Sequence, residues 1–247
     1  MTSGDPGPAQ RQLDWPGCAN VRDVGGLPTT DGGRIRSGTL IRSDSPHWLT
    51  ERGCAAVRSA GVRRILDLRS TEEAELDPSP FAGEAAYLPL PLIDPAREHE
   101  RDWDAERSHA AIYVGSLDRN GERIAAGRAA IADAPDGAVL VHCHAGKDRT
   151  GIVVALALRV AGVAPGVIAA DYALSADCLR ERHDTDLARL AEGPERAELR
   201  GLQRSEPETI LAMLTAVDER HGGVAEYLRH HGVSTAQQAR LRARLRE

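Results

Sequence analysis

The stretch that most constrains the fold lies near the middle of the chain, where a short apolar run leads through a polar loop into a longer apolar run. The short run, residues 139–142, follows turn-forming residues 134–137 and predicts a buried strand. The longer run, residues 152–161, is rich in alanine, leucine and valine and ends at Gly162, which predicts a helix. Residues 143–149 therefore wrap around the start of a helix.

A loop at this position is suited to bind an anion. The first N–H groups of a helix have no intrahelical partner, and the helix dipole adds a partial positive charge there. Gly146 permits a backbone conformation that turns N–H groups inward, and Arg149 offers a planar fork of donors for two phosphate oxygens. Together these features predict a cradle for an anion of phosphate size.

Cys143 lies beside this predicted cradle. The amides, Arg149 and His142 favour a thiolate, which is the nucleophilic form of cysteine. A thiolate facing a bound phosphate predicts covalent phosphoryl transfer, in which a cysteinyl-phosphate forms and is then hydrolysed. Arg149 and the loop amides would stabilise the equatorial oxygens, and the Thr150 hydroxyl would donate a hydrogen bond to the sulfur.

Residues 142–151, His-Cys-His-Ala-Gly-Lys-Asp-Arg-Thr-Gly, resemble the His-Cys-x5-Arg-Ser/Thr-Gly signature of the cysteine-dependent protein tyrosine phosphatase superfamily. The Gly-Lys-Asp-Arg variant resembles a bacterial atypical branch with activity on phosphotyrosine, phosphoserine/threonine and phosphoinositides. Upstream, residues 20–26, 41–43 and 66–70 extend the resemblance, so that it covers most of the chain up to about Ser175. The implied enzyme needs no metal or other cofactor.

The departing oxygen needs a proton donor. Many tyrosine phosphatases supply it from a separate Trp-Pro-Asp loop, and this sequence contains no Trp-Pro-Asp. In the bacterial branch resembled here, an aspartate within the signature loop is the proposed acid, which corresponds to Asp148. The alternative is that Asp148 only braces the loop and that the acid comes from the charged connection that holds Asp94, Asp102 and Asp104.

Other residues receive supporting roles. Asp67, at the end of a predicted strand over residues 62–68, is expected to brace the loop by accepting bonds from Arg149 or loop amides. His142 is expected to orient the backbone and tune the thiolate rather than to act as a base. The predicted phosphate loop consists of His144, Ala145, Gly146, Lys147, Asp148 and Arg149.

Lys147 is the only lysine among the 31 lysines and arginines of the chain. Because lysine is a compact, mobile charge, it could meet a second anionic group of the substrate without crowding. A zinc site at His142, Cys143 and His144 is disfavoured, since adjacent residues cannot converge on one metal.

The remaining pattern alternates strands and helices, which favours an α/β fold with a mostly parallel sheet flanked by helices. In such sheets ligands bind beyond the carboxyl ends of the strands, where Cys143 and Asp67 both emerge. Residues 1–12, polar and rich in glycine and proline, predict a disordered lead. Residues 13–247 then form a single domain, in which residues 176–247 are a helical cap or tail.

Composition excludes several classes of protein. A net charge of -6 gives no basic footprint for nucleic acid, and no segment is long enough to span a membrane. The polar N-terminus does not resemble a signal peptide, and the four cysteines are irregularly spaced. Because Cys143 must be reduced, we expect a cytoplasmic protein. The sequence leaves the oligomeric state open.

The sequence thus favours a protein tyrosine or dual-specificity phosphatase, whose partner is a phosphorylated protein substrate. The alternatives are a phosphatase of phosphoinositides or of another small-molecule phosphate, and a non-catalytic phosphate-binding module. Sulfur transfer and arsenate reduction also use a loop cysteine at a helix start. The Arg149-Thr150-Gly151 ending and the upstream resemblance argue against both.

Overall fold

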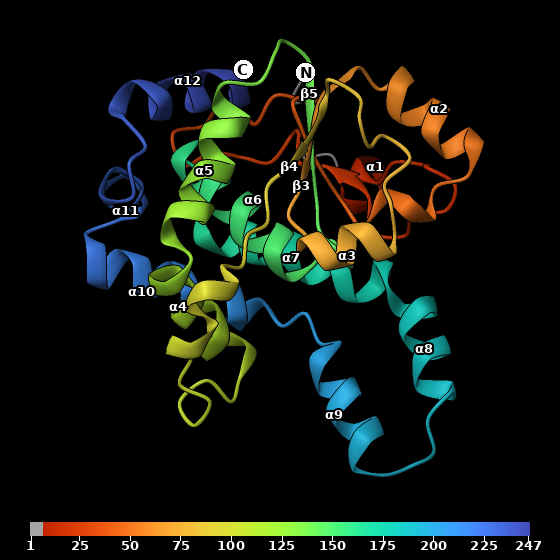
Figure 1. The fold of residues 1–247 in the computed structure, drawn as a ribbon. Helices are drawn as coiled ribbons and strands as arrows, with labels where there is room; N and C mark the ends of the chain where they lie inside the picture. The colour runs from red at the N-terminus through yellow and green to blue at the C-terminus, as the bar shows by residue number, and fades with distance from the viewer. Residues whose placement is uncertain (1–6) are drawn as a thin grey trace.

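The computed structural model describes residues 7–247, and a five-stranded sheet in the order β1-β2-β5-β3-β4 forms its centre (Figure 1). β1 runs antiparallel to β2, and the other neighbouring pairs are parallel, so the predicted mostly parallel sheet is confirmed. The strands are β1 (Arg22–Asp23), β2 (Leu40–Ser43), β3 (Val62–Asp67), β4 (Tyr87–Pro89) and β5 (Ala138–His142). β4 lies at an edge, as its proline predicts, because proline cannot donate to a central ladder.

The three inner strands end at the same level. Ser43 of β2 lies opposite His142 of β5, and Asp67 of β3 lies on the other side of His142. Cys143 therefore leaves the sheet between two other strand ends. The chain then enters helix α6 (Asp148–Val160), which confirms the predicted order of strand, loop and helix.

Both faces of the sheet are buried. In β5, Val139 and Val141 pack into the larger core, whereas Ala138 and Leu140 pack into a smaller one, as the alternation of side chains along a strand requires. The smaller core includes Val57 of α2 (Glu51–Ser59). The larger core takes residues from α6 and from α4 (His109–Arg119), α5 (Gly121–Ala132), α7 (Pro165–Cys178), α10 (Pro207–His221), α11 (Val224–His230) and α12 (Thr235–Leu245).

Side-chain caps fix several helix starts. The Thr50 hydroxyl accepts a bond from the Gly53 N–H at the start of α2. Ser234 and Gln237 form a capping box at the start of α12. A further capping box, formed by Ser70 and Glu73, starts helix α3 (Thr71–Leu76), which the sequence analysis did not predict.

The predicted disordered lead differs from the structure where it can be compared. Residues 1–6 lie outside the described residues, whereas Pro8–Arg11 forms the short helix α1. Arg11 is buried, and its Nη1 lies 2.6 Å from Oδ1 of Asp171 on α7. This long-range ion pair orders a segment whose composition alone indicates disorder.

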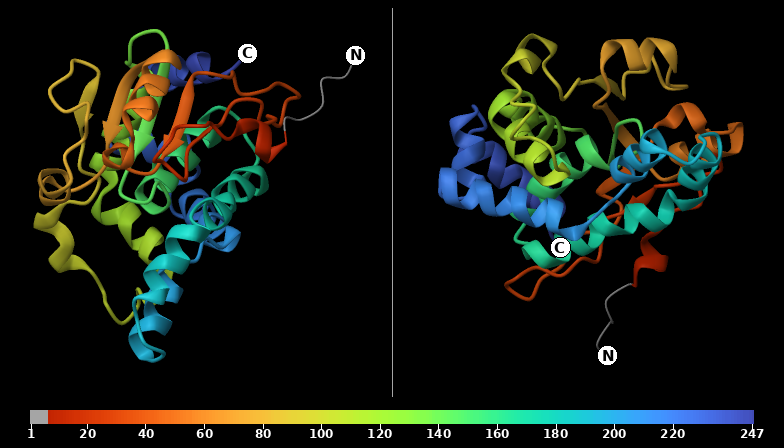
Figure 2. Two further views of the ribbon diagram at one scale, coloured as in Figure 1. Left: turned by 90° about the vertical axis from the view of Figure 1, so that its right-hand side faces the viewer. Right: turned by 90° about the horizontal axis from the view of Figure 1, so that it is seen from below.

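Residues 176–247 are not one cap or tail. Helices α10, α11 and α12 belong to the main core, whereas α8 (Arg180–Ala188) and α9 (Pro194–Leu202) form a two-helix arm that projects from the body (Figures 1 and 2). Arg182 of the arm contacts the body, since its Nη1 lies 2.8 Å from Asp44 and its guanidinium stacks over Trp48. Two 3-10 helices, η1 (Pro46–Trp48) and η2 (Pro95–Glu100), complete the elements. Among the described helices, none is long and apolar enough to cross a membrane.

Candidate active site

The loop of residues 143–149 joins β5 to α6, and donors from other segments hold its carbonyl oxygens from outside. Because a trans peptide places C=O and N–H on opposite sides, each bond to a carbonyl turns the following N–H toward the interior of the loop. The bonds are Ser45 N–H to His144 O, Asn20 Nδ2 to Ala145 O and Arg42 Nη2 to Gly146 O, each at 2.9 Å. Within residues 7–247, no acceptor pairs with the N–H groups of residues 144–147. The interior of the loop thus presents free donors to an anion.

Gly146 is required by both conformation and space. Its φ of 67° lies in the left-handed region that favours glycine. A Cβ at this position would lie 2.3 Å from the carbonyl oxygen of Ser43 at the end of β2. The close approach of β2 therefore fixes the curvature that the sequence analysis inferred from this glycine.

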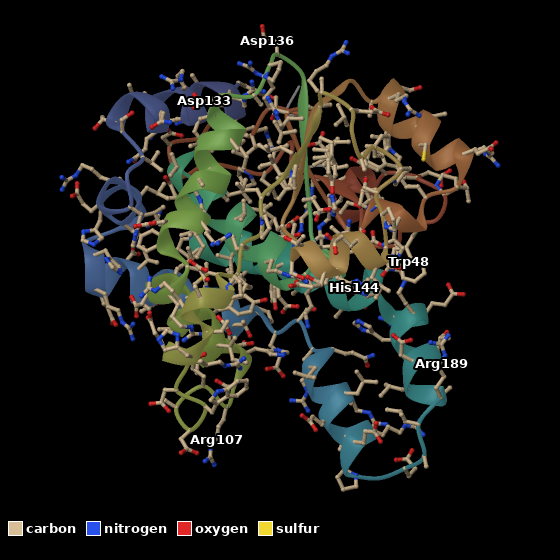
Figure 3. The ribbon with its side chains drawn as sticks, in the orientation of Figure 1. Trp48, Arg107, Asp133, Asp136, His144 and Arg189 are labelled. Carbon is tan, nitrogen blue, oxygen red and sulfur yellow. The ribbon has the colours of Figure 1, made fainter. Side chains whose placement is uncertain are left out.

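Cys143 is buried at the end of β5, with 2% of its surface exposed. Its charge is among the causes that raise the pKa of Arg149, so the two side chains lie within electrostatic reach of each other. His144, the next residue, is exposed (Figure 3). The loop therefore places the buried sulfur of Cys143 directly before the exposed side chain of His144.

Arg149 is held by Glu73 of α3, which the sequence analysis missed. Nη2 of Arg149 lies 2.7 Å from Oε1 of Glu73, and Nη1 bonds to Oε2. Burial alone would raise the pKa of Glu73, but the hydrogen bonds from Arg149 outweigh it and lower the pKa to about 2. The Ser70-x-x-Glu73 capping box directly after a predicted strand is the sequence signal that could have revealed this helix.

Asp148 is the first residue of α6, and its carboxyl is oriented by a tyrosine. The Tyr113 hydroxyl of α4 donates to Oδ1 of Asp148 at 2.7 Å and lies 3.0 Å from the Tyr172 hydroxyl. Burial, followed by the charge of Asp148, raises the pKa of Tyr113 well above its usual value, so this hydroxyl keeps its proton. The Asp148 side chain is 44% exposed, which lets it exchange protons with solvent.

The predicted role of Lys147 differs from its position in the structure. Its Nζ donates to Leu202 O at 2.5 Å and to Arg204 O at 2.9 Å, and lies 3.5 Å from Asp148. Lys147 is 3% exposed, so its ammonium does not face an open second anion site. It instead binds the carbonyl end of α9, where the helix dipole favours a cation.

Asp67 does not brace the loop through Arg149 or its amides, as expected, but through its own neighbours. It accepts bonds from Arg69, including Nη2 at 2.6 Å, and from the Tyr87 hydroxyl at 2.7 Å. Burial would raise the pKa of Asp67, but the Arg69 bonds lower it to about 2. Asp67 thus stabilises the strand end beneath the loop.

His142 makes the expected backbone contact, because its Nδ1 lies 3.2 Å from the carbonyl oxygen of Cys143. Burial lowers the pKa of His142 to about 4, so the ring is neutral at physiological pH. The predicted bond from Thr150 to the Cys143 sulfur is wrong for this structure. The Thr150 hydroxyl is buried without a hydrogen-bond partner among the described residues. Thr150 is already the third residue of α6, so its side chain is enclosed by the core.

The three alternative candidates for the general acid bind other groups, away from the phosphate loop. Asp94 caps η2 and lies 3.3 Å from Arg123. Asp102 accepts backbone N–H bonds within its own turn, and Asp104 pairs with Arg107. The structure therefore brings Asp148, but none of these three, to the signature loop in a described contact.

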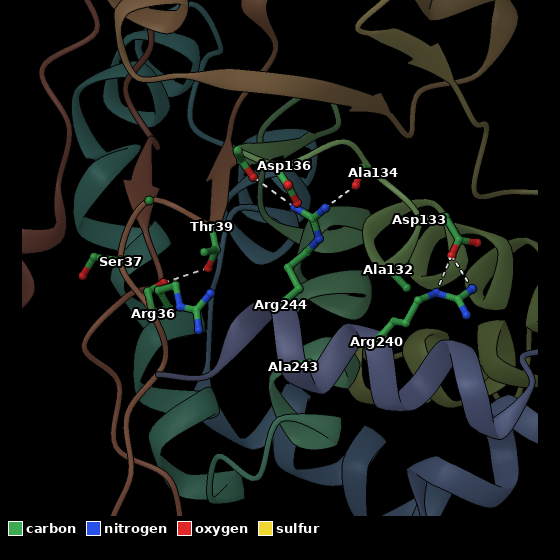
Figure 4. A pocket seen from close by; sticks show the side chains of 12 residues that line it. Arg36, Ser37, Thr39, Ala132, Asp133, Ala134, Asp136, Arg240, Ala243 and Arg244 are labelled. Carbon is green, nitrogen blue, oxygen red and sulfur yellow. Dashed lines mark hydrogen bonds and ion pairs between the residues drawn. The ribbon is translucent and has the colours of Figure 1, made fainter.

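Two cavities help to delimit the site. One of about 410 Å³ lies between the start of α4 and the end of α9, and His109 and Leu202 are among its lining residues. Another of about 920 Å³ lies at the start of β5, the end of that strand away from His144, next to Asp133 and Asp136 (Figures 3 and 4). In the second cavity Arg240 pairs with Asp133, and Arg244 donates to backbone carbonyls. Its arginines thus stabilise the fold.

Comparison with known proteins identifies the family of the chain. A model of the tyrosine phosphatase family matches residues 13–247. The chain belongs to this family. It is 32% identical over 276 residues to the triple specificity protein phosphatase PtpB of Mycobacterium tuberculosis, covering 95% of this chain and 98% of that protein. It is 30% identical over 222 residues to a tyrosine-protein phosphatase of Nostoc commune, covering 85% and 75%. The family resemblance read from the signature is confirmed.

Proposed function

We propose that the protein hydrolyses phosphomonoesters through a cysteinyl-phosphate intermediate. Its main substrate is phosphotyrosine in proteins, and it also acts on phosphoserine or phosphothreonine. The observation that carries this proposal is the loop of residues 143–149, which holds free N–H groups between the buried Cys143 and Arg149, two side chains within electrostatic reach of each other. Membership of the tyrosine phosphatase family supports it.

In the first step Sγ of Cys143 attacks phosphorus, and the bond from phosphorus to the ester oxygen breaks as the bond to sulfur forms. Asp148 gives its proton to the departing oxygen. In the second step water attacks phosphorus, Asp148 takes a proton from that water, and the thiolate leaves. Inorganic phosphate is released, and both side chains return to their starting states.

Arg149 and the loop amides stabilise the equatorial oxygens during both steps. Glu73 occupies one N–H of each terminal nitrogen of Arg149, which leaves Nε–H and the remaining N–H groups for phosphate. The pairing also limits the rotamers of Arg149, so less conformational entropy is lost when substrate binds.

The Asp148 role is supported by its contact with Tyr113. Because Tyr113 donates to Oδ1, the second carboxyl oxygen is left to carry the transferable proton. The expected result for Asp148→Asn is a loss of about a hundredfold on phosphotyrosine and a smaller loss on para-nitrophenyl phosphate, whose phenolate leaves more easily. Equal losses on both substrates would assign Asp148 to bracing the loop.

A wider substrate range is a second candidate, because one relative is named a triple specificity phosphatase. Turnover on phosphotyrosine peptides, phosphoserine peptides, a phosphoinositide and sugar phosphates would rank these substrates. We also propose a reducing, cytoplasmic location, which the four free cysteines support.

The test of the thiolate mechanism is hydrolysis of para-nitrophenyl phosphate in reducing buffer that contains a chelator. Cys143→Ser should lower turnover by about 10⁴-fold or more. Cys54→Ser, on the outer helix α2, is the matched control and should retain activity. Turnover that survives Cys143→Ser would disprove the covalent mechanism, and phosphopeptide binding without turnover in the wild type would identify a binding module.

A further inference from the structure

Two upstream motifs that the sequence analysis left without a role converge behind the phosphate loop. Asn20 and Arg22 come from residues 20–26, and Arg42 comes from residues 41–43. All three side chains are buried. Arg22 and Arg42 both bond to Asp171 of α7, and Asn20 joins them through Arg22, on the side of the loop that faces away from the anion cradle.

Asp171 is the centre of this cluster and pairs with three arginines. Its Oδ1 lies 2.6 Å from Arg11 Nη1 and 3.3 Å from Arg22 Nε, and its Oδ2 lies 3.0 Å from Arg42 Nη1. The three guanidinium groups are 6%, 1% and 2% exposed, and the carboxylate is 1% exposed. One buried carboxylate thus faces three buried cations, which leaves an excess of positive charge.

Such a cluster is costly for a purely structural device, because buried charges lose their hydration and apolar side chains of similar size are often as stable or more so. Burial, followed by the charge of Arg22, lowers the pKa of Arg42 to about 10. Nε of Arg42 has no hydrogen-bond partner within residues 7–247. The cost is understandable if the cluster acts on the neighbouring loop.

The contacts with the loop are specific. Nη2 of Arg42 donates to Gly146 O and Nδ2 of Asn20 donates to Ala145 O, each at 2.9 Å. These two carbonyls belong to the peptides that carry the N–H groups of Gly146 and Lys147. Fixing the carbonyls outward therefore fixes two N–H groups inward, toward the cradle.

We propose that Asn20 and Arg42 are positioning residues for phosphate binding, which hold the Gly146 and Lys147 N–H groups toward the anion. Asp171 and Arg22 keep the two donors in place, since Asp171 binds Arg42 and Arg22 Nη1 donates to Asn20 Oδ1 at 2.5 Å. The excess positive charge of the cluster favours a bound dianion. This inference rests on the proposed function of the loop and adds the residues that set its affinity.

The chain offers two matched controls. Arg128 of α5 is also fully buried and its pKa is also lowered to about 10 by burial, but it donates to Ile124 O of its own helix and, at 3.5 Å, to Ile152 O of α6 rather than to a carbonyl of residues 143–149. Ser175 belongs to the same cluster, where its hydroxyl lies 3.3 Å from Asn20 and from Arg22, but it has no described contact with the loop carbonyls. Arg128→Met tests the loss of a buried arginine, and Ser175→Ala tests disturbance of the cluster.

The experiment measures inorganic phosphate binding by calorimetry, together with KM, kcat and the midpoint of thermal unfolding. Asn20→Ala and Arg42→Met should each weaken phosphate binding about tenfold or more and raise KM more than they lower kcat. Arg42→Lys should restore part of the affinity. Arg128→Met and Ser175→Ala should change phosphate binding by less than about twofold even where Arg128→Met lowers the midpoint.

The proposal is overturned if Asn20→Ala and Arg42→Met lower the unfolding midpoint but bind phosphate as the wild type does. Asn20→Ala removes only a small amide and keeps the test valid if Arg42→Met fails to fold. Phosphate binding is measured without turnover, so this outcome is distinct from failure of the covalent mechanism, which Cys143→Ser tests. Equal weakening by Arg128→Met would also overturn it, because it would show a general effect of core disruption.

Discussion

The phosphate loop and the α8–α9 arm both lie toward the carboxyl ends of the parallel strands (Figure 1), but they are held by different numbers of contacts. The loop is bonded from β2, from the segment around Asn20, from the start of η1 and from α3. The arm contacts the body through Arg182 and through the bonds of Lys147 to its last turn. A region fixed by many buried partners has one geometry, whereas a region fixed by a few contacts opens locally at small cost.

Among substitutions in the two regions, replacing Arg149 of the loop should have the largest effect on kcat/KM. Arg149→Lys keeps a positive charge but loses the fork that binds two oxygens and Glu73 together, so kcat/KM should fall about a hundredfold to a thousandfold. Arg182→Lys in the arm is the matched substitution and should change kcat/KM by less than about threefold, because lysine keeps the charge that pairs with Asp44 and Arg182 has no described contact with residues 143–149. Steady-state kinetics on a phosphotyrosine peptide would measure both. Similar losses would show that the arm is as important to catalysis as the loop.

Glu73→Gln tests how much the ion pair with Glu73 contributes to the position of Arg149. Glutamine keeps the shape and one acceptor but removes the charge that holds Arg149, so kcat/KM should fall about tenfold through a higher KM. Glu75→Gln on the same helix is exposed and serves as the control. An unchanged KM in Glu73→Gln would show that bound phosphate, not Glu73, positions the arginine.

The strand end beneath the loop should respond to acid more than the arm does. The pKa of Asp67 in the folded state, about 2, lies below its ordinary value of 3.8, so its stabilising effect is present above about pH 4 and is lost as pH falls toward 2. The difference in unfolding free energy between wild type and Asp67→Asn should shrink by about 1 kcal/mol from pH 7 to pH 3. Urea unfolding at both values would measure it.

Asp186 provides the matching test in the arm, where it forms an exposed pair with Arg189. Asp186→Asn should change the unfolding free energy by less than about 1 kcal/mol at either pH. A pH-independent difference for Asp67→Asn would contradict the stabilising role assigned to its ion pair with Arg69.

The smallest expected effect is on local opening of the arm. Lys147→Met removes one bond to Leu202 at the end of α9 and one to Arg204 just beyond it, so proteolysis after Arg189, whose side chain is 72% exposed, should accelerate about fivefold. Arg180→Met, in an exposed pair with Asp177, is the control and should leave the rate near that of the wild type. Mass spectrometry of the fragments gives both rates. An unchanged proteolysis rate would show that contacts other than those of Lys147 keep the arm against the body. Arg182 would then be the next residue to change.

The features that sequence reasoning predicted are local in the chain. Strand, loop and helix follow one another within residues 138–160, so the apolar pattern and Gly146 were enough to place Cys143 and Arg149. The proline of β4 is also a local signal, because it cannot donate to a central ladder, and β4 lies at an edge of the sheet.

The features that it missed depend on distant partners. Glu73 is 76 residues from Arg149, Tyr113 is 35 from Asp148, and Asn20 is 125 from Ala145. No pattern of apolar residues encodes such pairs, because tertiary packing brings them together. Lys147 was misjudged for the same reason, since its acceptors are 55 and 57 residues away.

The solitary lysine of the chain has a practical consequence. Lys147 is the only lysine of the chain, so it is the only side-chain amine that an acylating reagent can modify. Its Nζ is enclosed by Leu202 O and Arg204 O, so acylation must wait until the end of α9 moves away. The protein thus carries its own chemical probe, and the rate at which Lys147 is labelled reports how often the arm parts from the phosphate loop.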